Sequence, residues 1–169
     1  MSDIGCERQD QPQLFDDLDR HLAAAGSFDR AALPMGLYLA WCANHQLLSR
    51  ELSERCAALI VRVRMRDASG SELAVAGCHG RLDGSHLNAE GCAFSARRYA
   101  DFRALLASRY GAELYAEGDD WARYDEIAPQ LTRWLREARG DSGDGEPPQR
   151  LPWQRNRTRA PRRGWKFWR

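Results

Sequence analysis

The residues best suited to metal or thiol chemistry lie in one glycine-rich segment, CHGRLDGSHLNAEGC. Zinc prefers imidazole, carboxylate and thiolate ligands, and the candidate ligands in this segment are His79, Asp83, His86 and Cys92, with Cys78 beside them. Structural zinc sites usually show paired ligands such as CxxC, whereas the spacings here are four, three and six residues, with no second pair elsewhere. We therefore expect no metal and no cofactor, and keep these residues as an alternative zinc site. The favoured interpretation is a turn held by the side chains of Asp83 and Asn88.

A cysteine–histidine pair is the other chemistry that the sequence allows. Cys78 or Cys92 could be activated by His45 or His86 if the fold brought them together, because such residues meet only in space. No flanking signature supports this, and the chain has no phosphate-binding glycine loop, GxSxG or HExxH motif. We predict that the protein is not an enzyme. A small metal- or cysteine-dependent enzyme is the third functional alternative.

Five acidic residues surround the start of the last predicted helix: Glu117, Asp119, Asp120, Asp125 and Glu126. Carboxylates at a helix N-terminus cap its free N–H groups and interact favourably with the helix dipole, and this structural role is the favoured one. A functional interpretation is a negative patch that meets a basic partner protein. These five residues are the candidate partner-binding site.

The charge of the chain is unevenly distributed. Residues 140–169 contain eight basic and three acidic residues, whereas the whole chain has a net charge of +1, so residues 1–139 are net acidic. Tryptophan beside arginine suits a membrane interface or stacking on nucleic acid. The candidate binding residues of this tail are Trp153, Arg155, Arg162, Arg163, Trp165 and Trp168. The alternatives are a solvated end without a binding role and a tail that docks back onto the acidic domain.

Chain length indicates the domain organisation, and the cysteines indicate the cellular compartment. We expect a disordered N-terminus at 1–12, one helical domain at 13–139, and a Pro/Gly linker with the basic tail at 140–169. Five irregularly spaced cysteines and a polar start without the apolar run of a signal peptide favour free thiols in a reducing cytoplasm. No stretch approaches the roughly 20 apolar residues that span a bilayer, so we expect no transmembrane segment.

The stretch LPMGLYLAWCANHQLL, residues 33–48, is the element around which the others must be organised. Pro34 suits the first turn of a helix, and Leu37, Trp41 and Leu48 recur at near-helical spacing. The apolar surface is wide enough to predict burial on more than one side. Gly36 costs about 1 kcal/mol relative to alanine inside a helix, so it lies at the helix start or lets another element approach closely.

Further helices are predicted by apolar residues at intervals of three to four, over 14–25, 50–66, 95–110 and 121–138. The end of the second, LIVRVRMR, also alternates like a strand, but its length favours helix. Pro129 should break the last helix and leave a turn at 121–126 and a main helix from about 129. Ser49 and Ser95 are expected N-caps. Residues 26–33 are expected to form a loop, with Phe28 folded back on the core.

The predicted fold class is mainly α, a compact single-domain bundle of about five helices with at most one minor, short strand pair. The expected core residues are aromatic: Trp41, Tyr99, Phe102, Trp121 and Trp134.

Three runs, GLYLAWCANHQLLSREL, CHGRLDGSHLNAEGCAFSARRYADF and YAEGDDWARYDEIAPQLTRWLREA, together resemble a bacterial family of small uncharacterised domains. Its members share a GxYLAW…L.S helix, a DG.L…L…G..F…Y segment and a W..YD.I…L…W end. The resemblance covers residues 14–138, and its aromatic and apolar motifs imply a fold rather than a chemistry. Many relatives have a histidine just before the central glycine, where this chain has Pro34 and Met35.

Small cytoplasmic domains of this kind are similar to immunity proteins, so the resemblance implies a protein that binds and neutralises a secreted bacterial toxin by protein–protein interaction. This step rests on analogy between families. The alternative is an adaptor whose basic tail binds an anionic membrane or nucleic acid.

Overall fold

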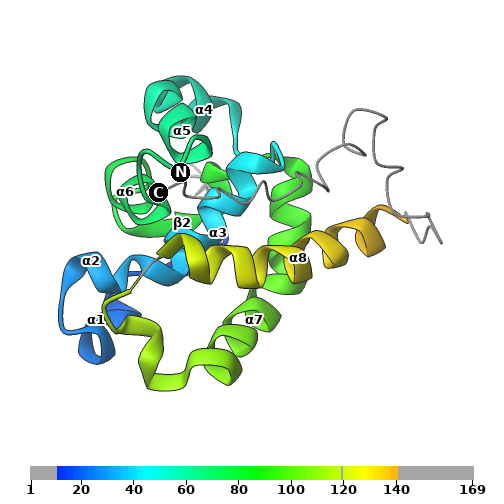
Figure 1. Cartoon of the computed structure of the whole chain (residues 1–169). Coiled ribbons are helices and arrows are strands. Elements are labelled where there is room, and N and C mark those ends of the chain that lie inside the picture. Colours follow the sequence, from blue (N-terminus) through cyan, green and yellow to red (C-terminus); the bar gives the residue numbers. More distant parts are fainter. Residues whose placement is uncertain (1–10, 119, 141–169) are drawn as a thin grey trace, which may run out of the picture.

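The computed structural model describes residues 11–118 and 120–140. In this part of the chain it shows eight α-helices, two 3-10 helices and one two-stranded antiparallel sheet (Figure 1). In chain order the elements are β1 (Leu14–Asp17), α1 (Asp19–Ala25), α2 (Phe28–Ala31), α3 (Leu33–Asn44), α4 (Arg50–Arg55), α5 (Ala57–Arg64), α6 (Gly70–Ala76), β2 (Arg81–Asp83), η1 (Gly84–His86), α7 (Ala89–Tyr110), η2 (Gly111–Tyr115) and α8 (Asp120–Arg139).

The mainly α class and the minor strand pair are confirmed, whereas the expected count of about five helices is too low. Of the predicted disordered N-terminus and basic tail, only residues 11, 12 and 140 belong to the described part of the chain. None of the described helices is long and apolar enough to cross a membrane.

Helix α3 is the centre of the fold, as the sequence predicts. Residues 33–43 are all buried, and α3 contacts α2, α5, α6, α7 and α8, which surround it (Figure 1). Its polar side chains are satisfied inside the core: the Tyr38 hydroxyl lies 2.7 Å from the Ser95 hydroxyl, and the Trp41 indole N–H donates to Thr132 at 3.1 Å. Burial on every side explains why this helix has no polar face.

Helices α3 and α6 cross at two glycines. A Cβ built on Gly36 would overlap the backbone of Ser71, and one built on Gly70 would overlap the carbonyl of Gly36. The two backbones are therefore in contact where they cross. Of the two roles predicted for Gly36, close approach of another element is the one that the structure has.

The predicted helix at 14–25 is wrong over its first turn, where β1 pairs antiparallel with β2. Leu14 lies opposite Asp83 and Asp17 opposite Arg81, with an irregularity in the register between them. The helical spacing misleads here because Phe15 and Asp16 are buried by tertiary contacts. Helix α1 follows and ends at a glycine with a left-handed backbone, as expected.

Segment 50–66 is helical rather than extended, which confirms the favoured interpretation, but it is two helices. The backbone at Cys56 has φ −112° and ψ 23°, which separates α4 from α5. The predicted cap is correct, because the Ser49 hydroxyl accepts the N–H of Leu52 at 3.2 Å. Helix α7 starts six residues earlier than predicted, with Asn88 as its cap instead of Ser95.

The predicted break at Pro129 is also wrong, since α8 is one helix with the proline inside it. Pro129 is exposed, and the buried residues Tyr124, Ile127, Leu131 and Leu135 form one stripe on both sides of it. We attribute the continuity to this stripe, whose burial offsets the missing hydrogen bond.

Two of the expected core aromatics are only partly buried: Trp121 and Trp134. Trp41, Tyr99 and Phe102 are buried as predicted. Phe28 is 66% exposed on α2, so the prediction that it folds back on the core is wrong.

Candidate functional site

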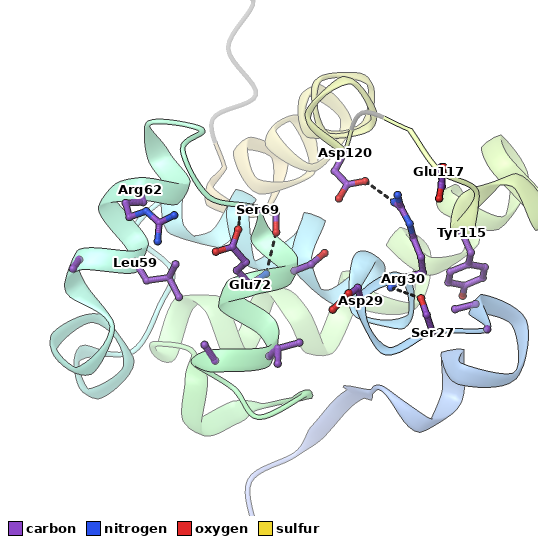
Figure 2. A pocket seen from close by; sticks show the side chains of 16 residues that line it. Ser27, Asp29, Arg30, Leu59, Arg62, Ser69, Glu72, Tyr115, Glu117 and Asp120 are labelled. Atoms are coloured by element: carbon purple, nitrogen blue, oxygen red, sulfur yellow. Dashed lines mark hydrogen bonds and ion pairs between the residues drawn. The ribbon is translucent and has the colours of Figure 1, made fainter.

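A groove with a volume of about 1210 Å³ opens between four segments of the chain (Figure 2). One wall is the α1–α2 connection and α2, and another is the segment from η2 to the start of α8. Helices α5 and α6 complete it. Each segment belongs to a different part of the sequence, so the packing of helices around α3 creates the groove.

Four carboxylates line this groove: Asp29, Glu72, Glu117 and Asp120. Two of them, Glu72 and Asp120, interact with other residues of the chain. Asp120 forms an ion pair with Arg30 at 3.2 Å, which joins α2 to α8 (Figure 2). Glu72 accepts the backbone N–H of Ser69 at 3.0 Å and so completes a capping box at the start of α6.

The other two carboxylates, Asp29 and Glu117, are exposed and make no hydrogen bond or ion pair through their side chains with the described residues. Arg62, the second arginine of the lining, donates to the carbonyl of Asp67 at 3.2 Å. Because Arg30 is already paired with Asp120, the groove has an excess of negative charge.

Apolar side chains form the part of the groove on α5 and α6. Ala58, Leu59, Val75 and Ala76 line it there, and Val75 is 42% exposed. The exposed ring of Phe28 lies on α2, between two lining residues in the sequence. Exposed apolar groups with charged groups around them are typical of surfaces that bind proteins.

Behind one wall lies a buried hydrogen-bond network that the sequence analysis did not identify. Tyr115 lines the groove, and its hydroxyl lies 2.7 Å from Nδ1 of His21. Nε2 of His21 lies 2.9 Å from the Asp16 carboxylate, which also accepts the Tyr99 hydroxyl at 2.8 Å. Asp16 is fully buried and His21 is 5% exposed. The network ties β1, α1, α7 and η2 together and so fixes this wall.

The charged state of Asp16 is favoured by this network. Burial alone would raise its pKa, but the hydrogen bonds from His21 and Tyr99, together with the nearby charge of Arg103, lower it overall. Desolvation raises the pKa of Tyr115, and the charge of Asp16 acts in the same direction. Tyr115 therefore remains a neutral phenol. No sequence pattern signals this network, since Tyr99 and Tyr115 are distant from Asp16 and His21 in the chain.

The predicted acidic site is divided between the groove and the outer surface of α8. Glu117 and Asp120 line the groove, whereas Asp119 lies outside the described residues. Asp125 pairs with Arg66, whose hydrogen bonds lower its pKa.

Glu126 accepts hydrogen bonds from Tyr110 at 2.7 Å and Arg109 at 3.0 Å, and its pKa is likewise lowered. Asp120 is shared between Arg30 and Arg123, each at 3.2 Å. Intramolecular arginines and a tyrosine thus engage three of the five acidic residues, and Glu117 remains the exposed member available to a partner.

The alternative zinc residues serve turns. Asp83 caps η1 by accepting the N–H of Ser85 at 3.0 Å, and its own N–H donates to Nδ1 of His86 at 3.3 Å. Cys92 points its thiol at the carbonyl of Gly84, 3.1 Å away, and His79 is exposed with φ 53°. Within residues 11–118 and 120–140, no three metal-binding side chains come together.

The suggested thiol–imidazole pairs do not occur among the hydrogen bonds of the described chain. His45 bonds to Thr132, and His86 bonds to the backbone of Asp83. Burial raises the pKa of Cys78 to about 12 and also raises that of Cys92. An activated thiol needs the opposite shift.

Six candidate tail residues lie outside the described part of the chain: Trp153, Arg155, Arg162, Arg163, Trp165 and Trp168.

Comparison with known proteins gives a match to the domain but not to this tail. A family model described as "Domain of unknown function (DUF7832)" matches residues 14–126, which include every residue that lines the groove. No curated protein and no solved structure matches the chain.

Proposed function

The chain belongs to the DUF7832 family, and from this starting point we propose that it is an immunity-type protein that neutralises a secreted bacterial toxin by binding it in the cytoplasm. The groove between α2, α5, α6 and the start of α8 is the docking surface. One observation carries the proposal: two exposed, unengaged carboxylates, Asp29 and Glu117, stand beside an exposed apolar wall.

The partner's chemistry follows from the groove. A basic side chain of the toxin meets Asp29 and Glu117, and an apolar side chain packs against Leu59 and Val75. Complementary charge speeds association and rejects acidic partners. The apolar contact supplies most of the affinity, because buried apolar anchors dominate protein interfaces. A toxin neutralised in this way presents a basic surface with one protruding apolar group.

The test is co-expression of the full chain with the product of the adjoining gene, followed by co-purification and a measurement of cell growth. We expect co-purification and protection for the natural protein. Asp29→Lys with Glu117→Lys should abolish both. The control is Glu54→Lys, which makes the same kind of charge change at an exposed ion pair on α4, and it should retain both. Failure of the natural protein to bind or protect would reject the proposal.

The adaptor alternative depends on the tail, so the same experiment separates the two. In the full chain, Trp153, Trp165 and Trp168 are changed to alanine. Under the immunity proposal, protection survives this change. Under the adaptor alternative, protection is not expected at all, and binding to anionic vesicles or nucleic acid is lost instead. For nucleic acid the affinity of the natural chain should also fall steeply with salt.

A further inference from the structure

A second hollow, of about 630 Å³, lies between the end of α3 and the middle of α8. We propose that this hollow binds the phosphate group of a small molecule through His45, Arg133 and Arg136. This site is separate from the groove and goes beyond the proposed function. Three observations carry it: a fixed imidazole, two arginines without acidic partners among the described residues, and a carboxylate, Asp125, that is already paired.

The imidazole of His45 is held in one orientation. Its ring lies 4.7 Å from the Trp41 ring, centroid to centroid, and its Nε2 lies 3.1 Å from the Thr132 hydroxyl. The Trp41 indole can only donate, so Thr132 accepts from it at 3.1 Å. The hydroxyl proton of Thr132 is then available to Nε2. In that arrangement the ring proton is on Nδ1, which is then the donor left for a ligand.

The arginines of the hollow have no acidic partner among the described residues. Arg136 makes no hydrogen bond or ion pair there, and Arg133 bonds to the amide oxygen of Gln130. Burial lowers the pKa of His45, and the charges of Arg139 and Arg136 lower it further. Arg139 itself is paired with Glu90. A neutral histidine beside two guanidinium groups that have no acidic partner among the described residues is an environment that attracts an oxyanion.

One of the two carboxylates that line the hollow is offset by an arginine from outside it. Asp125 is engaged by the guanidinium of Arg66, whereas Glu137 lies 3.8 Å from the guanidinium of Arg98, which itself bonds to Asp101 at 3.0 Å. Both arginines lie outside the lining. The rest of the lining adds two neutral hydroxyls, those of Tyr124 and Thr132. With Asp125 offset by Arg66, the two arginines of the hollow outnumber its remaining carboxylate, Glu137, and this balance together with the hydroxyl groups suits a phosphate better than a neutral ligand.

The experiment follows the imidazole signals of the full chain by NMR during pH titrations. Inorganic phosphate, phenyl phosphate and sodium acetate are compared with sodium chloride at equal ionic strength. Bound phosphate stabilises the protonated imidazole, so we expect a saturable rise in the pKa of His45 with both phosphates. The other three histidines, His21, His79 and His86, lie outside this hollow and should not respond.

Two arginine variants complete the test. Arg136→Ala should weaken phosphate binding about tenfold, the loss expected for one charge-assisted hydrogen-bonding partner. Arg50→Ala removes an exposed arginine of α4 that pairs with Glu54, and it should bind like the natural chain. An unresponsive His45, an equal response in Arg136→Ala, or an equal response to acetate would overturn the proposal. Glu117→Lys should leave phosphate binding intact, so this result is independent of the toxin experiment.

Discussion

At the scale of single residues, Asp16 has the most demanding position. Its carboxylate is fully buried and accepts hydrogen bonds from Tyr99 and the backbone of Asp17, beside the imidazole of His21. A buried charge is tolerated only when it is paired and hydrogen-bonded. Both conditions are met here, so the carboxylate fixes the geometry of the strand, the helix and the tyrosine around it.

We predict that Asp16→Asn destabilises the protein by about 3 kcal/mol, since breaking a buried pair leaves a partner unsatisfied. The –NH2 group of the new asparagine would also be placed beside a hydrogen-bond donor, the Tyr99 hydroxyl or the Asp17 N–H, and could not accept from it. Urea denaturation followed by circular dichroism measures the loss. Asp17→Asn is the matched control, because the ion pair of Asp17 with Arg20 at 3.3 Å is partly exposed and its loss should change stability by less than about 1 kcal/mol. Equal losses in the two variants would contradict the role assigned to Asp16.

The pKa of Asp16 also predicts how stability depends on pH. Its folded-state pKa is lowered from the ordinary value of 3.8, so the folded protein favours the ionised carboxylate. The resulting stability is complete above about pH 4 and is lost as the pH falls through the lowered pKa. Urea midpoints between pH 5 and pH 2 should decline in the natural protein and decline less in Asp16→Asn. Parallel declines would show that other groups control the acid transition.

At the scale of elements, the contact between α3 and α6 depends on Gly36. A methyl group there would overlap the backbone of Ser71, which cannot rotate away. We predict that Gly36→Ala costs about 1–3 kcal/mol through overpacking, although alanine is the better helix former. Gly84→Ala is the control, since its methyl group would meet the Cys92 sulfur at an ordinary 3.5 Å. Thermal unfolding of both variants measures the difference, and a stabilised Gly36→Ala would refute the close crossing.

Pro129 gives a prediction of the opposite sign. It interrupts the hydrogen bonds of α8 from an exposed position, and proline inside a helix costs up to about 3 kcal/mol relative to alanine. Pro129→Ala should therefore raise the free energy of unfolding by about 1–2 kcal/mol, since the freer unfolded chain offsets part of the gain. Gln130→Ala changes the neighbouring residue, loses only the exposed hydrogen bond from Arg133, and should change little. A loss of stability in Pro129→Ala would show that the ring itself is needed.

The sequence predicts those elements whose signals are local. Leu37 and Trp41 predict α3, and Ser49 marks the start of α4, because helical spacing and capping involve neighbouring residues. The strand at Asp16 was missed because its burial depends on His21 and on a tyrosine 83 residues away. The sequence predicts a division of α8 at Pro129, because the penalty for proline is a local signal whereas the packing of the buried stripe depends on other elements.

The candidate site was predictable only in part, for the same reason. Glu117 and Asp120 were identified from their charge at a helix start, and both line the groove. Asp29 and Val75 could not be placed beside them, since the groove forms only when four distant segments pack around α3. The arginines that engage the other acidic residues also come from other elements. Charge was visible in the sequence, but its pairing was not.

At the scale of the whole molecule, α3 joins all the packing into one unit. It contacts five other helices, including α6 and α8, whose sides form the groove and the hollow. The two candidate sites therefore share one core, although only the lining of the groove is net acidic. Because α2, α5, α6 and α8 all pack on α3, local opening of one of these helices without loss of the core is expected to be rare.

Two buried thiols can measure this cooperativity. Cys42 lies in α3 and Cys78 follows α6, and both are free and buried. Burial raises the pKa of Cys42 well above its ordinary value and that of Cys78 to about 12, so neither reacts as a thiolate in the folded state. We predict that a thiol reagent at pH 8 labels both at one rate, set by global unfolding, and labels the less buried Cys56 and Cys92 faster. Mass spectrometry of peptides along a urea series gives the four rates. Much faster labelling of Cys78 than of Cys42 would mean that α6 opens independently and that the groove is not fixed to the core.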